Sequence, residues 1–297
     1  MKFRPLLAYS PKPKRPLVLE ELRYPLLVSP KFDGIRAVVT ARGLLSRTLK
    51  RVPNRELQQL LSRSLLCCYD GELVLGDPAA PDCYHRTESQ VMSADGGALG
   101  ITFWVFDYFQ QPAMPYTERL ARLRRGPHVK FVPRVKLVPQ FKAGCAADVQ
   151  VLEELYVAKG FEGIMLRSPD GLYKCGRSTL SEQYLIKVKR FEDSEARVLA
   201  VYPRQRNNNA QTRDERGYAK RSTAKAGKVA TKMLGGFHCR DLKTGVEFDC
   251  GTGTLKREEL ALEGWVGTVI KYRFQPSGVK DKPRYPRFVG RRKRSDR

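Results

Sequence analysis

Three lysines occur in sequence settings that suit phosphoryl chemistry. Lys31 precedes the turn-forming run Phe32-Asp33-Gly34, and Arg36 follows closely enough to fold back beside it. A desolvated lysine crowded by a second cation would have a lowered pKa and a nucleophilic amine. Lys187 and Lys189 are two residues apart in a predicted strand, so both ammonium groups point the same way and suit a phosphate in transfer. Taken singly, these lysines are more typical of an exposed surface.

Two carboxylates and one aromatic ring extend this set. Glu72 and Glu162 each stand beside a glycine in a mostly apolar strand. A buried carboxylate needs a partner, and the candidates are a divalent metal, a ribose hydroxyl or the lysines. The alternative is that each carboxylate simply ends its strand. Phe106 is either a core residue or a ring that stacks on a purine.

Composition indicates a globular protein that binds polyanions. The chain has 297 residues, of which 41% are hydrophobic and 29% charged, so it can bury a core and exceeds a single small module. Its 55 Lys and Arg against 31 Asp and Glu give a formal net charge of +24. A surface field of this strength favours partners such as nucleic acid.

The cysteines and the chain start favour a reducing compartment. Seven cysteines include no Cys-x-x-Cys spacing, which suits neither a disulfide framework nor a zinc site. The first residues lack the apolar run of a signal peptide, and no segment approaches 18 apolar residues. We therefore expect a soluble protein that is not secreted and has no membrane partner, located in the cytoplasm, the nucleus or a viral factory.

The elements that would position these residues alternate irregularly up to a boundary near residue 190. Helices are predicted at 55–65 with Asn54 as N-cap, at 117–125, and at 147–159 with Val151, Leu152, Leu155 and Tyr156 on the buried face. Strands are predicted at 24–28, 35–40, 68–75, 101–108, 161–166 and 184–189.

The chain beyond residue 190 has the pattern of a small β-barrel with an insertion. Strand signals occur at 196–202, 235–239, 246–248, 266–270 and 287–290. The segment 203–233 has nine bases and two acids with little to bury, so we expect a mobile loop. Such a loop suits contacts to the phosphate backbone of DNA, although a merely solvated loop is the alternative.

Six motifs in order resemble those of covalent nucleotidyltransferases, and within them the minimal ATP-dependent DNA ligases. They are Lys31 to Arg36, Ser46-Arg47, Asp70 to Leu73, Phe106 to Tyr108, Glu162 to Leu166 and Leu185 to Lys189. The insertion Gly217 to Lys228 and the ending Pro283 to Arg297 add to the likeness, which covers nearly the whole chain.

This resemblance implies an ATP-dependent ligase that seals 3′-hydroxyl/5′-phosphate nicks. Lys31, within the motif that includes Asp33, would form lysyl-AMP. Arg36 and Glu72 would hold the ribose, and Phe106 would stack on adenine. Glu162, together with Glu72, would hold Mg²⁺ or Mn²⁺, and Lys187 and Lys189 would bind the α-phosphate. The remaining implied contacts are Asp296 and Arg297 for pyrophosphate, Arg47 and Arg177 for the 5′-phosphate, and Lys220, Arg221, Lys225 and Lys228 for duplex DNA.

The resemblance also implies an α+β fold with a nucleotidyltransferase (adenylation) domain at 1–190. This domain would have antiparallel sheets and flanking helices. An OB-fold would follow at 191–297, with 203–233 as a latch, in a monomer that acts in replication, repair or recombination. The shared motifs leave an RNA ligase or an mRNA-capping guanylyltransferase open as alternatives. A catalytically silent nick-binding protein is a third interpretation, but binding alone would not require both acids.

Overall fold

The computed structural model describes residues 3–11, 16–126, 132, 134–189, 191–213, 219–222, 224–256, 259–275 and 282–292. The chain divides into two compact units, Met1–Arg190 and Phe191–Arg297. Each unit has a hydrophobic core of its own. None of the described helices is long and apolar enough to cross a membrane.

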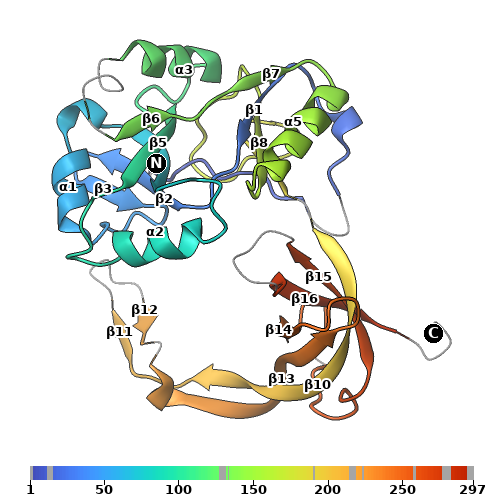
Figure 1. Ribbon diagram of the computed structural model, residues 1–297. Helices are drawn as coiled ribbons and strands as arrows, with labels where there is room; N and C mark the ends of the chain where they lie inside the picture. The colour runs from blue at the N-terminus through green and yellow to red at the C-terminus, as the bar shows by residue number, and fades with distance from the viewer. Residues whose placement is uncertain are drawn as a thin grey trace. The chain divides into compact units, whose positions relative to one another are not determined.

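The first unit contains a five-stranded sheet with the order β3-β2-β4-β5-β6 (Figure 1). Its strands are β2 (Ile35–Thr40), β3 (Gly43–Ser46), β4 (Tyr69–Leu75), β5 (Ile101–Tyr108) and β6 (Val135–Leu137). Neighbouring strands are antiparallel except β5 and β6, which are parallel. Burial alternates along β5, as expected of a strand with one face on a core.

Three helices accompany this sheet: α1 (Arg55–Leu61), α2 (Cys83–Val91) and α3 (Tyr116–Arg125). The Asn54 side chain accepts a hydrogen bond from the Leu57 amide, so the predicted N-cap is confirmed. The predicted helix at 55–65 is shorter than expected, because α1 ends at Leu61 and a 3-10 turn, η2 (Ser64–Leu66), follows.

A four-stranded sheet with the order β7-β1-β8-β9 completes the first unit. Its strands are β1 (Leu26–Pro30), β7 (Phe141–Ala143), β8 (Gly163–Arg167) and β9 (Ile186–Lys189). The 3-10 helix η1 (Leu19–Glu21) and the helix α5 (Ala146–Ala158) pack with this sheet. The core here includes Val28, Ile164 and Ile186.

The face that α5 buries differs from the prediction. Val151 and Leu155 are 65% and 44% exposed, whereas Val149 and Tyr156 are buried. Glu153 is also buried. The helix has apolar residues on several sides, so its periodicity admits more than one buried stripe, and packing against the sheet selects positions 149, 153 and 156.

The second unit is a closed barrel with the strand order β10-β13-β14-β16-β15. The strands are β10 (Glu192–Asn207), β13 (Lys228–Asp241), β14 (Glu247–Gly251), β15 (Val269–Gln275) and β16 (Arg284–Arg291). Phe237, Trp265 and Phe288 pack together in its core. The strand predicted at 266–270 begins later, at Val269, because Gly267 has a positive φ and belongs to the preceding turn.

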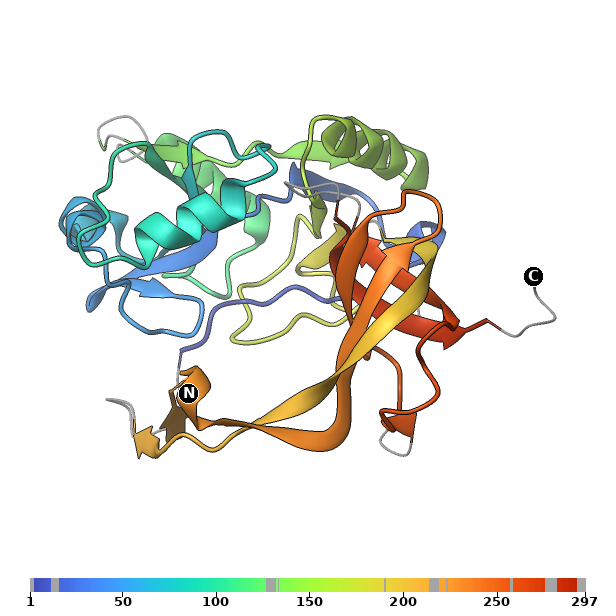
Figure 2. The same cartoon turned by 60° about the horizontal axis from the view of Figure 1, so that its bottom comes forward.

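The expected mobile loop at 203–233 is instead largely regular in its described part. The strands β10 and β13 extend beyond the barrel as a two-stranded ribbon, paired out to Asn207 and Lys228 (Figure 2). A smaller pair, β11 (Gln211–Arg213) with β12 (Ala219–Arg221), and the 3-10 turn η3 (Lys225–Gly227) follow along the chain. The prediction was wrong because backbone hydrogen bonds hold a ribbon without any apolar side to bury.

Candidate functional site

One pocket in the first unit collects most of the predicted site residues. It has a volume of about 300 Å³, at the small end for ligand pockets. The predicted residues that line it are Lys31, Arg36, Arg47, Glu72, Phe106, Arg177, Lys187 and Lys189. These residues come from parts of the chain up to 158 positions apart, so the fold itself assembles the group.

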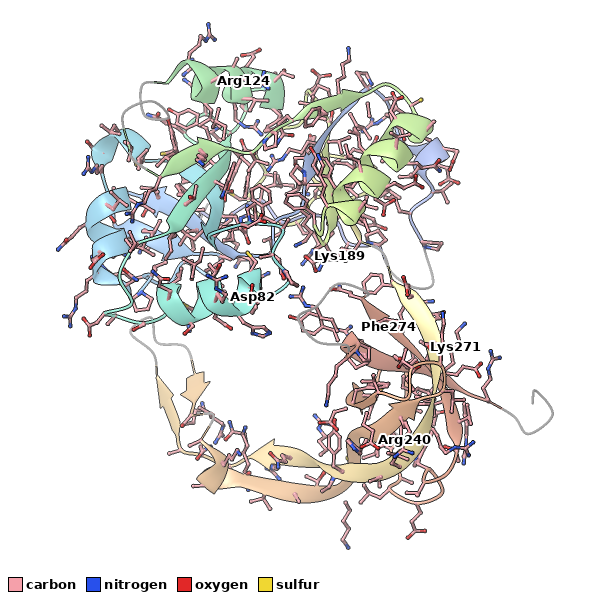
Figure 3. The ribbon with its side chains drawn as sticks, viewed as in Figure 1. Asp82, Arg124, Lys189, Arg240, Lys271 and Phe274 are labelled. Carbon is pink, nitrogen blue, oxygen red and sulfur yellow. The ribbon has the colours of Figure 1, made fainter. Side chains whose placement is uncertain are left out.

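Strand pairing explains why these side chains meet. In the five-stranded sheet, Arg36 on β2 is directly opposite Glu72 on β4. In the other sheet, Lys187 and Lys189 on β9 are opposite Met165 and Gly163. Figure 3 shows Lys189 on the first unit. The backbone amide of Lys31 donates a 2.9 Å hydrogen bond to the carbonyl of Gly163, which ties the lysine to the same sheet.

Gly163 allows this close approach. Its φ is +146°, and a Cβ atom there would lie 2.2 Å from the carbonyl oxygen of Val188. Any side chain would therefore push β8 away from β9. The glycine after Glu162 thus has a packing reason, and it keeps Glu162 next to the lysines of β9.

Glu162 forms ion pairs with two lysines at once. One carboxylate oxygen accepts from the Lys31 ammonium and the other accepts from the Lys189 ammonium. The Glu162 side chain is 3% exposed. Burial would raise the pKa of Glu162, but the charges of Lys31 and Lys189 outweigh it and lower the pKa. Glu162 is therefore ionised and does not merely end a strand.

The pKa of Lys31 is shifted in the opposite direction to the one predicted. Burial alone would lower it, but the charge and hydrogen bond of Glu162, with Glu72 and Asp33 nearby, raise it above its ordinary value. The expected crowding by Arg36 does not prevail, because Arg36 is itself paired with Asp70. Lys31 is therefore an ammonium at neutral pH in this state.

The two lysines of β9 have lowered pKa values. Burial lowers the pKa of Lys189 to about 8, with the charge of Lys31 acting in the same direction. For Lys187, burial is again the main cause of its lowered pKa, and the charges of Lys31, Arg177 and Arg47 add to it. Like charges gathered on one wall destabilise each other, so the pocket favours an anion.

Arg36 and Glu72 have different surroundings although they are adjacent. The Arg36 guanidinium donates to both oxygens of Asp70, at 3.0 and 2.6 Å, and the Tyr173 hydroxyl donates to Asp70 at 2.6 Å. Burial opposes the charge of Arg36, but Asp70 outweighs it and raises the pKa. Glu72 makes no ion pair within the described ranges, and burial raises its pKa to about 7.

Phe106 is half-buried and borders the pocket. The guanidinium carbons of Arg36 and Arg167 lie 5.3 and 5.5 Å from its ring centre. The Tyr116 hydroxyl donates a 3.0 Å hydrogen bond to the Phe106 carbonyl. The ring is therefore held by its neighbours, and it is partly available to an aromatic ligand, which combines the two interpretations of Phe106.

A buried ionic cluster behind the pocket was not foreseen from the sequence. Asp107 accepts hydrogen bonds from Arg119 at 2.7 and 3.2 Å and from Arg167 at 2.5 Å. All three side chains are at most 3% exposed. The signal available was a charged residue within or at the end of two apolar strands. The cluster joins β5, β8 and α3 and sets Arg167 on the pocket wall.

The remaining predicted residues are not among the described residues that line this pocket. Asp33 influences the pKa of Lys31 but does not line the pocket. In the barrel unit, Arg221 donates to the carbonyl of Asn209 at 2.6 Å and to the Gln211 side chain at 3.0 Å. Lys225 and Lys228 are exposed and half-buried, and Lys220 is described only by its backbone. Asp296 and Arg297 lie outside the described residues.

The carboxylates suit a divalent metal only together with a ligand. The described residues contain no group of three or more His, Cys, Asp or Glu that could hold a metal ion. Mg²⁺, however, commonly takes one or two carboxylates and completes its shell with phosphate oxygens and water. Glu72 and Glu162 fit that donor set. Glu72 has no ion-pair partner among the described residues, and Glu162 already binds two cations, the ammonium groups of Lys31 and Lys189.

Comparison with protein-family models gives two matches. Residues 5–189 match the ATP dependent DNA ligase domain, and residues 226–292 match the DNA ligase OB-like domain. The first match covers more than half of the chain. Together they show the predicted fold class, a mixed α+β ligase domain followed by an OB-like barrel.

Individual relatives agree with this result. The DNA ligase of African swine fever virus (isolate Tick/Malawi/Lil 20-1/1983) is 27% identical over 190 residues, which cover 57% of this chain and 42% of the viral protein. The match thus spans less than half the length of that relative.

Two solved structures are similar over nearly the whole chain. A Lig E DNA ligase, from a study of DNA binding with a minimal scaffold, has a TM-score of 0.72 and 25% identity and covers 98% of this chain and 100% of its own. Chlorella virus DNA ligase-adenylate has a TM-score of 0.55 and 28% identity, covering 97% and 99%. The chain belongs to the ATP-dependent DNA ligase domain family.

Proposed function

We propose that this protein is an ATP-dependent DNA ligase that seals nicks between a 3′-hydroxyl and a 5′-phosphate in duplex DNA. The observation that carries the proposal is a half-buried lysine, Lys31, in a pocket whose walls also hold Lys187, Lys189 and Glu72. Family membership and the ligases among its relatives support the reaction class.

The first step would transfer AMP to the protein. The lone pair of Lys31 Nζ attacks the α-phosphorus of ATP, a P–N bond forms, and the bond to the β-phosphate breaks to release pyrophosphate. The ammonium must first lose one proton to expose this lone pair, and a second proton leaves the nitrogen after the P–N bond forms. Because Glu162 is the largest influence that raises the pKa of Lys31, weakening their ion pair lets burial count for more and favours the neutral amine.

The nucleotide would lie against the side chains that border Lys31. Phe106 offers a ring for the adenine base, and Arg36 and Glu72, opposite each other on β2 and β4, would hold the ribose hydroxyls. Asp70 and Tyr173 fix Arg36 for this role. Lys187 and Lys189 would neutralise charge on the α-phosphate as the transition state forms.

A divalent metal would be held by Glu162 and Glu72 together with the phosphates of ATP. When bound, Mg²⁺ or Mn²⁺ supplies positive charge that stabilises the α-phosphate and the leaving pyrophosphate. Glu162 would then share its charge with the metal and hold Lys31 less strongly. The ion pair between Glu162 and Lys31 would therefore belong to the state before the metal and ATP bind.

The second and third steps would use the same phosphate wall. The 5′-phosphate of a nick attacks the AMP phosphorus, the P–N bond breaks and DNA-adenylate forms. The 3′-hydroxyl then attacks the DNA phosphate and AMP leaves. Arg47 and Arg177 would hold the 5′-phosphate, a role that is supported by their position on the pocket wall with Lys187.

The barrel unit would contribute contacts to the DNA backbone. We assign a nucleotidyltransferase domain to residues 1–190, and an OB-fold with a DNA latch at about 203–233 to residues 191–297. Lys220, Arg221, Lys225 and Lys228 are the proposed phosphate contacts, and Asp296 and Arg297 are proposed to orient pyrophosphate in the first step. The enzyme would act as a monomer, inside the cell, in replication, repair or recombination.

A labelling experiment separates this function from its alternatives. The protein is incubated with Mg²⁺ and α-labelled ATP or GTP, and then chased with nicked DNA or nicked RNA. Label from ATP that moves to the DNA 5′-phosphate and ends in sealed DNA supports the proposal. Label from GTP would indicate a guanylyltransferase, and joining of RNA alone would indicate an RNA ligase. Binding to nicked DNA without any label on the protein would indicate a catalytically silent nick-binding protein.

A further inference from the structure

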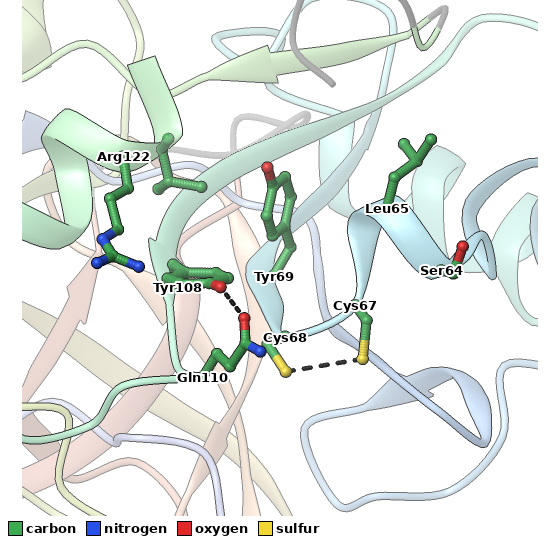
Figure 4. Close-up of a pocket in the computed structure, with 9 residues that line it drawn as sticks. Ser64, Leu65, Cys67, Cys68, Tyr69, Tyr108, Gln110 and Arg122 are labelled. Atoms are coloured by element: carbon green, nitrogen blue, oxygen red, sulfur yellow. Dashed lines mark hydrogen bonds between the residues drawn. The ribbon is translucent and has the colours of Figure 1, made fainter. Parts of the chain in front are cut away.

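A second pocket lies in the first unit and shares no lining residue with the nucleotide pocket. Its volume is about 280 Å³. Figure 4 shows residues that line it, among them Cys67, Cys68, Tyr108 and Arg122. The wall contains two adjacent thiols, Cys67 and Cys68, whose sulfur atoms are 3.6 Å apart. Both cysteines are half-buried, and none of the functions proposed above uses them.

The backbone explains why two neighbouring thiols lie on the same side. Successive side chains of an extended chain point in opposite directions. Cys68 has a φ of +72°, in the left-handed region that residues other than glycine seldom adopt. This backbone conformation breaks the alternation of the two side chains. Two backbone hydrogen bonds hold the conformation, from the Cys68 amide to Val39 at 2.8 Å and from the Phe109 amide to Cys68 at 2.9 Å. The pair is therefore built into the fold.

The surroundings suit a ligand that has an apolar part and reacts with sulfur. Leu65, Leu123 and the rings of Tyr69 and Tyr108 supply apolar wall, and Arg122 supplies a cation. Burial, with a contribution from Cys67, raises the pKa of Cys68 to about 12, so this thiol is protonated at neutral pH and reacts slowly with simple alkylating agents. A reagent that bonds to both sulfur atoms is favoured instead, because the two atoms are only 3.6 Å apart.

We propose that Cys67 and Cys68 form a dithiol site for trivalent organoarsenicals and chemically similar thiophilic metalloids. The reaction is R–As=O + 2 R′SH → R–As(SR′)₂ + H₂O. Two As–S bonds replace the bonds from arsenic to oxygen, and the thiol protons leave on that oxygen as water. No oxidation state changes, so no oxidant or reductant is needed. The two sulfurs act as a chelate, because the second bond forms within one molecule.

The pair lies directly before β4. Cys68 is followed by Tyr69, the first residue of that strand, and the same strand carries Asp70 and Glu72. An arsenical bound here would thus sit beside the strand that carries Glu72, which lines the pocket around Lys31, and Asp70, which pairs with Arg36.

The test uses the full chain, reduced with a phosphine, and phenylarsine oxide as the probe. Intact-mass spectrometry should show one phenylarsenic group with the loss of two protons per protein, and an excess of a small dithiol should remove it. Peptide mapping of the chain without substitutions should place the adduct on Cys67 and Cys68. Cys67→Ser and Cys68→Ser should each weaken binding by ~100-fold.

Matched controls use the single exposed thiols. Cys145→Ser and Cys175→Ser should bind the probe like the original chain, since each removes an exposed cysteine outside the pocket. Mapping of the adduct to other residues, or undiminished binding in both pocket variants, would overturn the proposal. The mapping result does not depend on any variant folding, and it is separate from the outcome of the adenylation test.

Discussion

Glu162 has a central role because one carboxylate holds two lysines that must act differently. Lys31 is the proposed nucleophile and needs a neutral amine, whereas Lys189 is a proposed phosphate ligand and needs its charge. The ion pairs with Glu162 favour the charged form of both. In the absence of substrate this arrangement stores Lys31 as an unreactive ammonium.

Glu162→Gln should lower the pKa of Lys31. The substitution removes the largest influence that raises this pKa, so burial, which lowers it, is then opposed only by the weaker charges of Glu72 and Asp33. Lys31 should be acylated several-fold faster near neutral pH, measured as a rate-against-pH profile for its tryptic peptide by mass spectrometry. Glu182→Gln, which breaks the partly exposed pair with Lys174, is the control and should leave the profile unchanged. An unshifted profile in Glu162→Gln would show that Glu162 does not control the amine.

Asp107→Asn should strongly destabilise the first unit. The change leaves Arg119 and Arg167 buried without a full counter-charge, a loss of about 3–5 kcal/mol in the free energy of unfolding. Urea unfolding can be followed through Trp104 in a Trp265→Phe background, since the chain has two tryptophans and Trp104 belongs to the first unit. Glu182→Gln should cost at most about 1 kcal/mol, because its pair is partly exposed.

The same cluster predicts a pH dependence. The pKa of Asp107 is lowered, because Arg167 and Arg119 outweigh its burial. Its stabilising contribution is therefore complete above the unfolded pKa of about 3.9 and is lost as the pH falls through the lower folded value. The stability difference between the original chain and Asp107→Asn should shrink in acid, and a constant difference would contradict the assignment.

The ribbon formed by β10 and β13 allows a cleaner deletion than a loop would. The two strands are still paired at Asn207 and Lys228, so residues 208–227 can be replaced by Asn-Gly, a two-residue turn suited to a hairpin. This removes five bases and two acids. We expect weaker binding to nicked DNA and a shallower salt dependence, by about 0.9 in the log–log slope for each DNA phosphate that the variant no longer neutralises.

The charge effect can be separated from the fold by a second variant. Replacing the five bases of 208–227 with Gln keeps the chain length and should lower affinity in the same way. Binding can be measured by fluorescence anisotropy over a salt titration. An unchanged slope in both variants would mean that this segment does not touch the DNA phosphates.

Elements with one dominant pattern were predictable, and those with competing patterns were not. The alternating strand β5 and the Asn54 cap follow from local chemistry. The buried face of α5 depends on which sheet it meets, and the helix itself is apolar on several sides. The ribbon formed by residues 203–207 and 228–234 is held by backbone pairing, which leaves no apolar signature.

The site divides in a similar way. Most of the residues that the motifs single out line one pocket, but their ionisation could not be predicted from the sequence. The sequence places Arg36 near Lys31, whereas strand pairing gives Arg36 to Asp70 and gives Lys31 to Glu162, which is 131 residues distant. Arg167 and Asp107 were missed because a salt bridge between two sheets has no local pattern.

For the protein as a whole, the positive charge is spread over both units, whereas the proposed catalytic residues around Lys31 are in the first unit. The pocket around Lys31 is lined by residues of the first unit alone, whereas the net charge of +24 is spread along the chain. Most of this excess lies outside residues 208–227, so removing them should weaken DNA binding without abolishing it. Each unit has its own core, and each contains one tryptophan, Trp104 or Trp265, that can report its unfolding.

The central claim is that Lys31 becomes covalently attached to AMP. Purified protein is first treated with pyrophosphate to remove any adenylate and then incubated with ATP and Mg²⁺, and its peptides are mapped by mass spectrometry. We predict one adenylate group on the Lys31 peptide, its absence in Lys31→Ala and its persistence in a Lys174→Ala control. A protein that gains no adenylate, or carries it on another side chain, would contradict the account.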